Sequence, residues 1–259
     1  MRTILIAVGV IVTGLLLPLT VSFLERCLFE DNCLVPSVNA TPERGIKSTL
    51  TADSDLPRQC STPANFEISY VYRRGSAGQA KAFGHGDVLH SGDSYKLLFK
   101  PTDNSFVYIF QIDSSHKIFR LFPTKDFANA DLKNDNPVMI GTQYFVPAEQ
   151  WSFQLDNTTG RETIYFVVTC ERDSALETQY ATMVTMQNSR SISQRHQARQ
   201  TWDRAMKGRG PQPNLVKDIT STTISPLTWT EGNIDHITLP EYLKNLCNGC
   251  VHIVEFNHQ

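Results

Sequence analysis

The strongest constraint on the fold is the stretch FVYIFQI, which begins at Phe106 and is apolar at both alternating sets of positions. Tyr108 and Phe110 belong to one set with Phe106, while Val107 and Ile109 form the other. β-branched and aromatic residues favour strands, and a strand with one wet face would alternate apolar with polar residues. The pattern therefore predicts a strand buried on both faces.

The segments on either side have the same character. Apolar residues alternate at 95–99 and recur at 118–122, and polar turn residues lie between the runs at 101–104 and 113–116. This arrangement predicts three antiparallel strands joined by tight loops. Their aromatic side chains could stack on sugars, but strands of this composition are more often core, so we interpret them as scaffold.

Further elements follow from periodicity and end signals. Strands are predicted at residues 66–74, 143–147, 151–155, 162–170 and 251–256. Helices are predicted from a capping box at Ser174–Glu177, from Ser193 to Lys207 with Ala198, Trp202 and Met206 on one stripe, and from Pro240 to Cys247. The expected fold class is α+β and mainly β: an antiparallel sheet or sandwich with two or three helices in the C-terminal third, preceded by one transmembrane helix.

The run from Thr3 to Leu24 carries no charge over 22 residues. As a helix it would extend about 33 Å, roughly one bilayer core. A cleaved signal peptide is the alternative, but its apolar region should be shorter and its cleavage site closer. We expect a retained anchor over residues 1–26, a flexible Pro-, Ser- and Thr-rich tether over 27–63, and a β-rich domain over 64–259.

Charge suggests where that domain lies and what it does not bind. Arg2 and the amino terminus precede the apolar run, and Glu25, Arg26, Glu30 and Asp31 follow it. We therefore expect the amino terminus inside and the domain outside the cytoplasm, at a bacterial inner membrane facing the periplasm, or secreted if the segment is cleaved. Lys and Arg number 24 against 26 Asp and Glu. This balance disfavours nucleic acid as a partner.

Six cysteines suit an oxidising compartment. They are Cys27, Cys33, Cys60, Cys170, Cys247 and Cys250. Cys247 and Cys250 form a CxxC pair, which could be a structural disulfide, a redox pair or, with His252, part of a metal site. The predicted helix would put both thiols at its negative end, which disfavours redox, and no further ligands complete a metal site. We expect a structural disulfide.

Two polar groups merit a functional interpretation. Arg195, Arg199, Arg204 and Lys207 make one segment basic, which suits anionic lipid headgroups or an acidic partner, although a solvated helix face explains the same letters. The sequence His85-Gly-Asp87 with His90 resembles an acid–base cluster, but surface polar residues at a strand edge account for it without a nucleophile motif.

Several motifs together resemble a known family. YKLLFKP, VYIFQIDSS, RLFP, NPV, YFVPAEQWSF and LDNTTGRETIYFVVT are similar to the bacterial domain of unknown function 4384, over residues 87–175. An echo of the closing strand at 251–258 extends the resemblance to 64–259. It implies a β-rich extracytoplasmic or modular accessory domain, with no established activity and no catalytic residues.

This chain departs from the family pattern at two places. His116 stands where a turn glycine is usual, and His tolerates a positive φ better than a β-branched residue does. Cys170 stands where the family has Ser, and Cys60 is also additional. The coincidence predicts a disulfide between Cys60 and Cys170.

The expected function is that of a membrane-anchored, non-enzymatic interaction domain outside the cytoplasm, without cofactor or metal, which binds a protein or a cell-envelope component. The alternative is an enzyme, most simply a thiol–disulfide exchange factor that uses Cys247 and Cys250.

Overall fold

A computed structural model of the chain describes residues 64–259, with gaps at 77, 124–133, 190, 211–214 and 217–224. The predicted membrane segment at Thr3–Leu24 and the tether over 27–63 lie outside the described residues. Within the described part, no helix is long and apolar enough to span a bilayer. The described part is mainly β, with two antiparallel-rich sheets and two α-helices.

The first sheet has the strand order β10–β13–β1–β4–β7, with β2 beside β1 and β8 beside β4. Its strands are β1 (Ala64–Arg73), β2 (Lys81–Ala82), β4 (Ser94–Pro101), β7 (Tyr144–Val146), β8 (Phe153–Gln154), β10 (Leu215–Val216) and β13 (Glu241–Leu246). The predicted strands at 66–74, 95–99, 143–147 and 151–155 all lie here. A short 3₁₀ turn at Arg74–Ser76 follows β1.

The second sheet has the strand order β3–β14–β9–β5–β6. Its strands are β3 (Val88–Leu89), β5 (Phe106–Ile112), β6 (Ile118–Phe122), β9 (Gly160–Thr169) and β14 (Val251–His258). β14 and β9 pair along their length, from Val251 opposite Val167 to His258 opposite Gly160. β3 runs parallel to the end of β14, and the other pairs are antiparallel.

The two sheets pack face to face around the main core. Phe66 on β1 lies 5.4 Å from Phe166 on β9, and Phe99 on β4 lies 5.4 Å from Phe122 on β6, both measured between ring centroids. All four side chains have exposed fractions of 0%. The aromatic run of residues 95–122 therefore contributes to the interior, where burial of large rings supplies much of the stabilisation of a sandwich.

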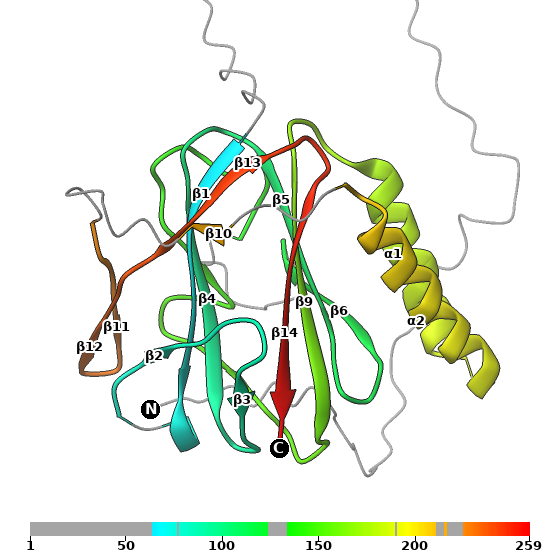
Figure 1. Cartoon of the computed structure of the whole chain (residues 1–259), viewed down its shortest axis with the longest axis horizontal. Helices are drawn as coiled ribbons and strands as arrows, with labels where there is room; N and C mark the ends of the chain where they lie inside the picture. Colours follow the sequence, from blue (N-terminus) through cyan, green and yellow to red (C-terminus); the bar gives the residue numbers. More distant parts are fainter. Residues whose placement is uncertain (1–63, 77, 124–133, 190, 211–214, 217–224) are drawn as a thin grey trace, which may run out of the picture. The chain divides into compact units, whose positions relative to one another are not determined.

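The helices cover the outer face of the second sheet. They are α1 (Ser174–Gln187) and α2 (Ile192–Lys207), which lie side by side in Figure 1. On β5, Val107 and Ile109 face the sandwich core, while Tyr108 and Phe110 join the cluster under the helices. This division confirms the predicted strand that is buried on both faces.

A hairpin covers part of the outer face of the first sheet. It consists of β11 (Leu227–Glu231) and β12 (Ile234–Thr238), which Figure 1 shows on the far side of the sheets from the helices. Leu227 and Trp229 of the hairpin pack on Val71 and Leu98. The described part thus has four layers: helices, second sheet, first sheet and hairpin.

The three strands predicted from 95 to 122 form, but they do not lie in one sheet. β5 and β6 are a hairpin, whereas β4 lies in the first sheet and pairs with β1 over eight positions, from Phe66 opposite Pro101 to Arg73 opposite Ser94. The turn after β4 leads from the first sheet to the second instead of closing a hairpin within one sheet. Local turn chemistry marks where the chain reverses but not which partner the next strand selects.

The prediction of a short helix from Pro240 to Cys247 is wrong, because this segment forms strand β13. The prediction relied on helix end signals. Leu243 and Leu246, which are three residues apart, are both fully buried. In the structure a bulge puts both on one face of a strand: Asn245 has φ 61°, and the register against β1 shifts between Ala64 and Phe66. An extra bulge residue makes strand spacing look helical.

The capping box at the start of α1 is displaced by one residue. Asp173, not Ser174, is the N-cap, and its carboxylate accepts a hydrogen bond from the backbone N–H of Leu176. Glu177 does not reach back to the cap. It pairs with Arg172 at 2.7 Å and accepts a hydrogen bond from Tyr108. Asp and Ser are equally good N-cap residues, so the sequence alone places the start of α1 only to within one residue.

Candidate interaction surface

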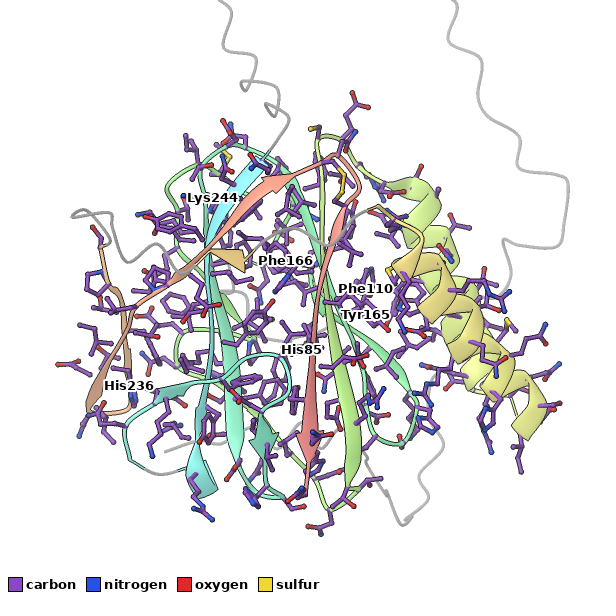
Figure 2. All side chains as sticks on the ribbon, viewed as in Figure 1. His85, Phe110, Tyr165, Phe166, His236 and Lys244 are labelled. Carbon is purple, nitrogen blue, oxygen red and sulfur yellow. A yellow bond between two sulfur atoms is a disulfide. The ribbon has the colours of Figure 1, made fainter. Side chains whose placement is uncertain are left out.

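The basic face consists of Arg195, Arg199, Arg204 and Lys207, all on α2. The helix is held by its other side, where the predicted stripe of Ala198, Trp202 and Met206 is buried. The stripe packs on the second sheet, where Phe110 lies beside the helices (Figure 2), and Arg199 extends toward the β5–β6 turn of that sheet. Arg195, Arg204 and Lys207 are exposed, and Arg199 is half-buried.

Asp203 neighbours two cations of the basic face, since, against the opposing effect of burial, the charges of Lys207 and Arg199 both help to lower its pKa. Lys207 pairs with Asp203 at 2.9 Å, and Asp203 also accepts a hydrogen bond from the Tyr165 hydroxyl. Within the described part of the chain, no carboxylate lies within ion-pair distance of Arg195, Arg199 or Arg204. A solvated helix face usually carries charges of both signs, so this surface is suited to an acidic partner.

A hollow of about 410 Å³ lies at one end of the basic face. It is bounded by the β5–β6 turn, which includes His116 and Lys117, and by the corner between α1 and α2, which includes Arg195 and His196. Arg199 Nη1 lies 3.0 Å from His116 Nε2. His116 has φ 68°, as expected for a residue that replaces a turn glycine. Sequence analysis did not connect this turn with the helix.

A buried charge cluster lies under the hairpin, and sequence analysis missed it. Glu231 on β11 is 2.6 Å from Arg73 Nη2 and 3.3 Å from Lys96 Nζ. The Lys96 ammonium also lies 5.6 Å from the ring of Trp229. Burial lowers the pKa of Lys96 to about 8, against the opposing effect of Glu231. The partners are 135 residues apart in the chain, so no local pattern connects them.

Lysines with a lowered pKa can act as bases or nucleophiles, so the surroundings of Lys96 decide its role. Its exposed fraction is 1%, and the hollow beside it has a volume of only about 10 Å³. That is room for about one water and not for a substrate. We therefore interpret the cluster as the attachment of the hairpin to the first sheet.

A serine, a histidine and a glutamate converge where β14 ends. Ser91 Oγ lies 3.0 Å from His258 Nε2, and His258 Nδ1 lies 3.7 Å from Glu162 Oε1. This order of residue types resembles a hydrolase triad. His258 and Glu162 are each 2% exposed, whereas Ser91 is exposed. The three residues come from distant parts of the chain, and no sequence motif marked them.

The hydrogen bonds around this group support a structural role. Both carboxylate oxygens of Glu162 are engaged, one by Gln111 Nε2 at 2.8 Å and one by the backbone N–H of Ser114 at 2.9 Å. The backbone N–H groups of Ser91 and Gly92 donate to Gln259 and Leu155 carbonyls. They are therefore not free to stabilise an oxyanion, which a hydrolase requires. The group closes one end of the second sheet.

The predicted polar cluster of His85, Asp87 and His90 does not converge on one site. Asp87 accepts a hydrogen bond from the backbone N–H of Gly84, and His85 Nδ1 accepts one from the backbone N–H of Glu255. His90 instead neighbours Asp93, with 3.9 Å between Nδ1 and Oδ2. These contacts hold turns at the sheet edge, in line with the interpretation as surface polar residues.

Cys247 and Cys250 form a disulfide in the turn between β13 and β14, with their Cα atoms 5.1 Å apart. This is an ordinary span for a disulfide. Cys250 is 2% exposed, and a Cβ placed on Gly210 would lie 2.9 Å from its sulfur, so the chain after α2 packs closely on the bond. The pair joins two strands and lacks the helix N-terminus that activates a redox thiol. Among the described residues, no group of three or more metal-ligating side chains is present.

The remaining cysteines are only partly described. Cys170 at the end of β9 is disulfide-bonded, and its backbone N–H donates to Asn248 Oδ1 at 3.0 Å. Cys27, Cys33 and Cys60 lie outside the described residues. The pairing of Cys60 with Cys170 therefore stays a prediction.

Replacing both Cys247 and Cys250 with serine is expected to lower the free energy of unfolding by about 2 kcal/mol, because the loop that the bond closes is short. Urea unfolding of the full-length protein, followed by tryptophan fluorescence, measures the loss. A variant of unchanged stability that has lost a thiol-exchange activity would instead favour the enzyme alternative.

His252 on β14 is buried inside the sandwich with neither ring nitrogen hydrogen-bonded within the described residues. Its ring centroid lies 6.2 Å from that of Tyr70, whose hydroxyl likewise has no partner there. Burial, and to a smaller extent the charge of His85, lowers the pKa of His252 to about 4. The folded protein therefore holds this imidazole neutral over a range of pH in which the unfolded chain protonates it.

This difference in pKa predicts acid sensitivity. Below pH 6.5 the unfolded state binds a proton at His252 that the folded state does not, so stability is lost as the pH falls from 6.5 to 4, by about 3 kcal/mol in total. Urea unfolding at pH 7 and pH 4 should show a smaller loss for His252→Leu than for the wild type. His90→Gln, at an exposed histidine, is the matched control, and an equal loss in all three proteins would contradict the prediction.

Comparison with known proteins leaves one match. No curated protein and no solved structure matches the chain. The matched segment covers β3 to β9 and ends just before α1. It includes the turn of His116 but not α1, α2 with its basic face, or the hairpin. Residues 88–172 match the family described as "Domain of unknown function (DUF4384)".

Proposed function

We propose that this protein is a non-enzymatic interaction domain, anchored in a bacterial membrane and presented outside the cytoplasm, which binds an acidic protein or envelope component through the basic face. The observation that carries the proposal is the group of three arginines that have no ion-pair partner among the described residues, on a helix whose apolar side packs on the sheet. Arginine is the residue best suited to carboxylate and phosphate groups, because its planar fork donates two parallel hydrogen bonds.

The location outside the cytoplasm has independent support. The described part contains the disulfide of Cys247 with Cys250, and Cys170 is disulfide-bonded as well. Disulfides persist in oxidising compartments and are rare in the cytosol. The uncharged run Thr3–Leu24 is long enough to serve as the anchor. The protein should stay with membranes after a carbonate wash, and protease added to spheroplasts should digest it.

Binding through the basic face is tested by charge reversal in the full-length, membrane-bound protein. Arg199→Glu with Arg204→Glu should abolish a crosslinked product that forms in cells from a photo-reactive residue placed at Gln197, which is exposed on the same helix. Binding that depends on exposed charges should also weaken as salt is raised.

The matched control carries the same change of charge elsewhere. Lys81→Glu with Arg161→Glu alters two exposed cations on β2 and β9, neither of them on α2. It should leave the crosslink intact. Loss of the product in the control as well, or its survival in the α2 variant, would reject the basic face as the contact surface.

A further inference from the structure

The hollow beside the basic face is a built pocket between two elements. One wall is the β5–β6 turn with His116 and Lys117, and the other is the α1–α2 corner with Ser189, Arg195 and His196. The turn is held by Asp113, which is 3% exposed. Its carboxylate accepts hydrogen bonds from Ser115 and from the backbone N–H of Lys117, so the turn presents its side chains from a fixed frame.

The pocket has an unusual concentration of positive charge. Lys117 and Arg195 line it with two histidines, and none of the residues that line it, all within the described part, is acidic. His116 lies between Arg199 and His196: Arg199 Nη1 is 3.0 Å from its Nε2, and the centroid of the His196 ring is 6.1 Å from its own. Partial burial, then Arg199 and His196, lower the pKa of His116. Like charges repel, so an anion that binds among these cations would lower the electrostatic energy of the cluster.

The size and the lining of the pocket indicate the kind of anion. About 410 Å³ lies within the usual range for small-molecule sites and exceeds what a bare phosphate ion fills. Ile192, which lines the pocket, leaves 67% of its side chain exposed and offers an apolar contact. An ammonium and a guanidinium together suit the oxygens of a phosphate group, while the apolar residue suits an attached organic group.

We infer that this pocket binds the phosphate group of a small phosphorylated molecule or of a phospholipid headgroup, with Lys117 and Arg195 as its charged contacts. The inference rests on the proposed function, since it names the anionic group that the basic face meets. Both sources present the same phosphate chemistry, and the experiment below distinguishes them.

The test uses the full-length protein and two probes, inorganic phosphate and vesicles of phosphatidylglycerol compared with phosphatidylcholine. The pocket variant is Lys117→Gln with Arg195→Gln, and the control is Lys81→Gln with Arg161→Gln; all four residues are exposed, so both variants should keep the fold. Thermal unfolding checks this. Binding of at least one probe should be tenfold or more weaker in the pocket variant and unchanged in the control.

A loss with inorganic phosphate identifies a free phosphorylated ligand, and a loss with phosphatidylglycerol vesicles alone identifies a headgroup. Equal behaviour of the wild type and the pocket variant toward both probes, including no binding by either, overturns the inference. That result leaves the proposed function intact as long as the Arg199 and Arg204 charge reversal still abolishes the crosslink. Loss of the proposed function is recognised separately, by a crosslink that survives this reversal.

Discussion

Replacing Trp202 with alanine is expected to lower the free energy of unfolding by about 3–5 kcal/mol, the usual cost of removing a buried large ring. Trp202 is 0% exposed and lies under α2 against the second sheet. Its ring centroid is 4.7 Å from that of Phe110, at an interplanar angle of 74°, and 6.0 Å from that of Tyr180. No other side chain of α2 connects the helix to both the sheet and α1 through aromatic contacts of this kind in the described residues.

The loss should come from packing alone. The indole N–H of Trp202 has no hydrogen-bond partner within the described residues, so its removal leaves no polar group without a hydrogen bond that it had before. Hydrogen exchange of the full-length protein should show faster exchange first in α2, since that element loses its anchor. Trp202→Phe should cost less, because a ring still fills part of the space.

Gln197→Ala is the matched control for Trp202, because it alters an exposed position on the same helix. It should change stability by less than about 0.5 kcal/mol. A Trp202→Ala protein within about 1 kcal/mol of the wild type would mean that α2 is not held by this cluster, and the basic face would then lack the rigid base that the proposed function requires.

Replacing Glu231 with alanine should have an effect of similar size, about 3–5 kcal/mol, because removing one partner of a buried ion pair leaves the other charge uncompensated. Glu231 holds Arg73 and Lys96 at 2.6 and 3.3 Å, and the exposed side-chain fractions of the three residues are 12%, 9% and 2%. The hairpin of β11 and β12 should detach from the first sheet. Hydrogen exchange of the hairpin and urea unfolding report the two effects.

The pH dependence of this variant has a defined sign. Without Glu231, the pKa of Lys96 should fall below its value of about 8, so the folded variant carries a neutral lysine where the unfolded chain stays protonated up to its ordinary pKa. The folded state then binds fewer protons, and stability rises with pH. Part of the deficit should therefore disappear between pH 7 and pH 9, where Lys96 of the wild type also becomes neutral.

Two further variants separate charge from packing in this cluster. Lys96→Met in the Glu231→Ala background should recover part of the lost stability, since it removes the stranded ammonium and keeps an apolar stem. Arg161→Ala breaks an exposed pair with Glu255 at 4.0 Å, with Arg161 65% exposed, and should cost less than about 1 kcal/mol. A Glu231→Ala cost no larger than that of Arg161→Ala would exclude a fastening role for the cluster.

Prediction from sequence succeeded where one element carries its own pattern. The strand at Phe106 was recognised because both alternating sets are apolar, and α2 because Ala198, Trp202 and Met206 recur once per turn. It failed at β13, because the residues at both ends of this segment resemble helix end signals although the segment is a strand with a bulge at Asn245. Periodicity reports which side chains are buried together, and a single irregular residue can change the element that it implies.

The candidate site was predictable only in part. The basic residues of α2 were visible in the sequence, but their meeting with His116 and Lys117 depends on how the helices dock on the second sheet. Glu231 with Lys96, and Ser91 with His258, were not predictable, because the partners are more than 100 residues apart in the chain. A single polar residue has no periodic pattern in the sequence from which its distant partner could be predicted.

The amino-acid sequence by itself determined the β-rich class, the two-sided burial of β5, the apolar stripe of α2 and the cationic charge on its other faces, because each depends on side chains that are neighbours along one strand or helix. Only the tertiary structure decided that β4 and β5 enter different sheets, that a hairpin is fastened by a buried ion pair, and that a positively charged pocket opens beside the basic face. The physical reason is that strand pairing, ion pairing and pocket formation are contacts between distant segments, whose free energy depends on the packing of the whole core.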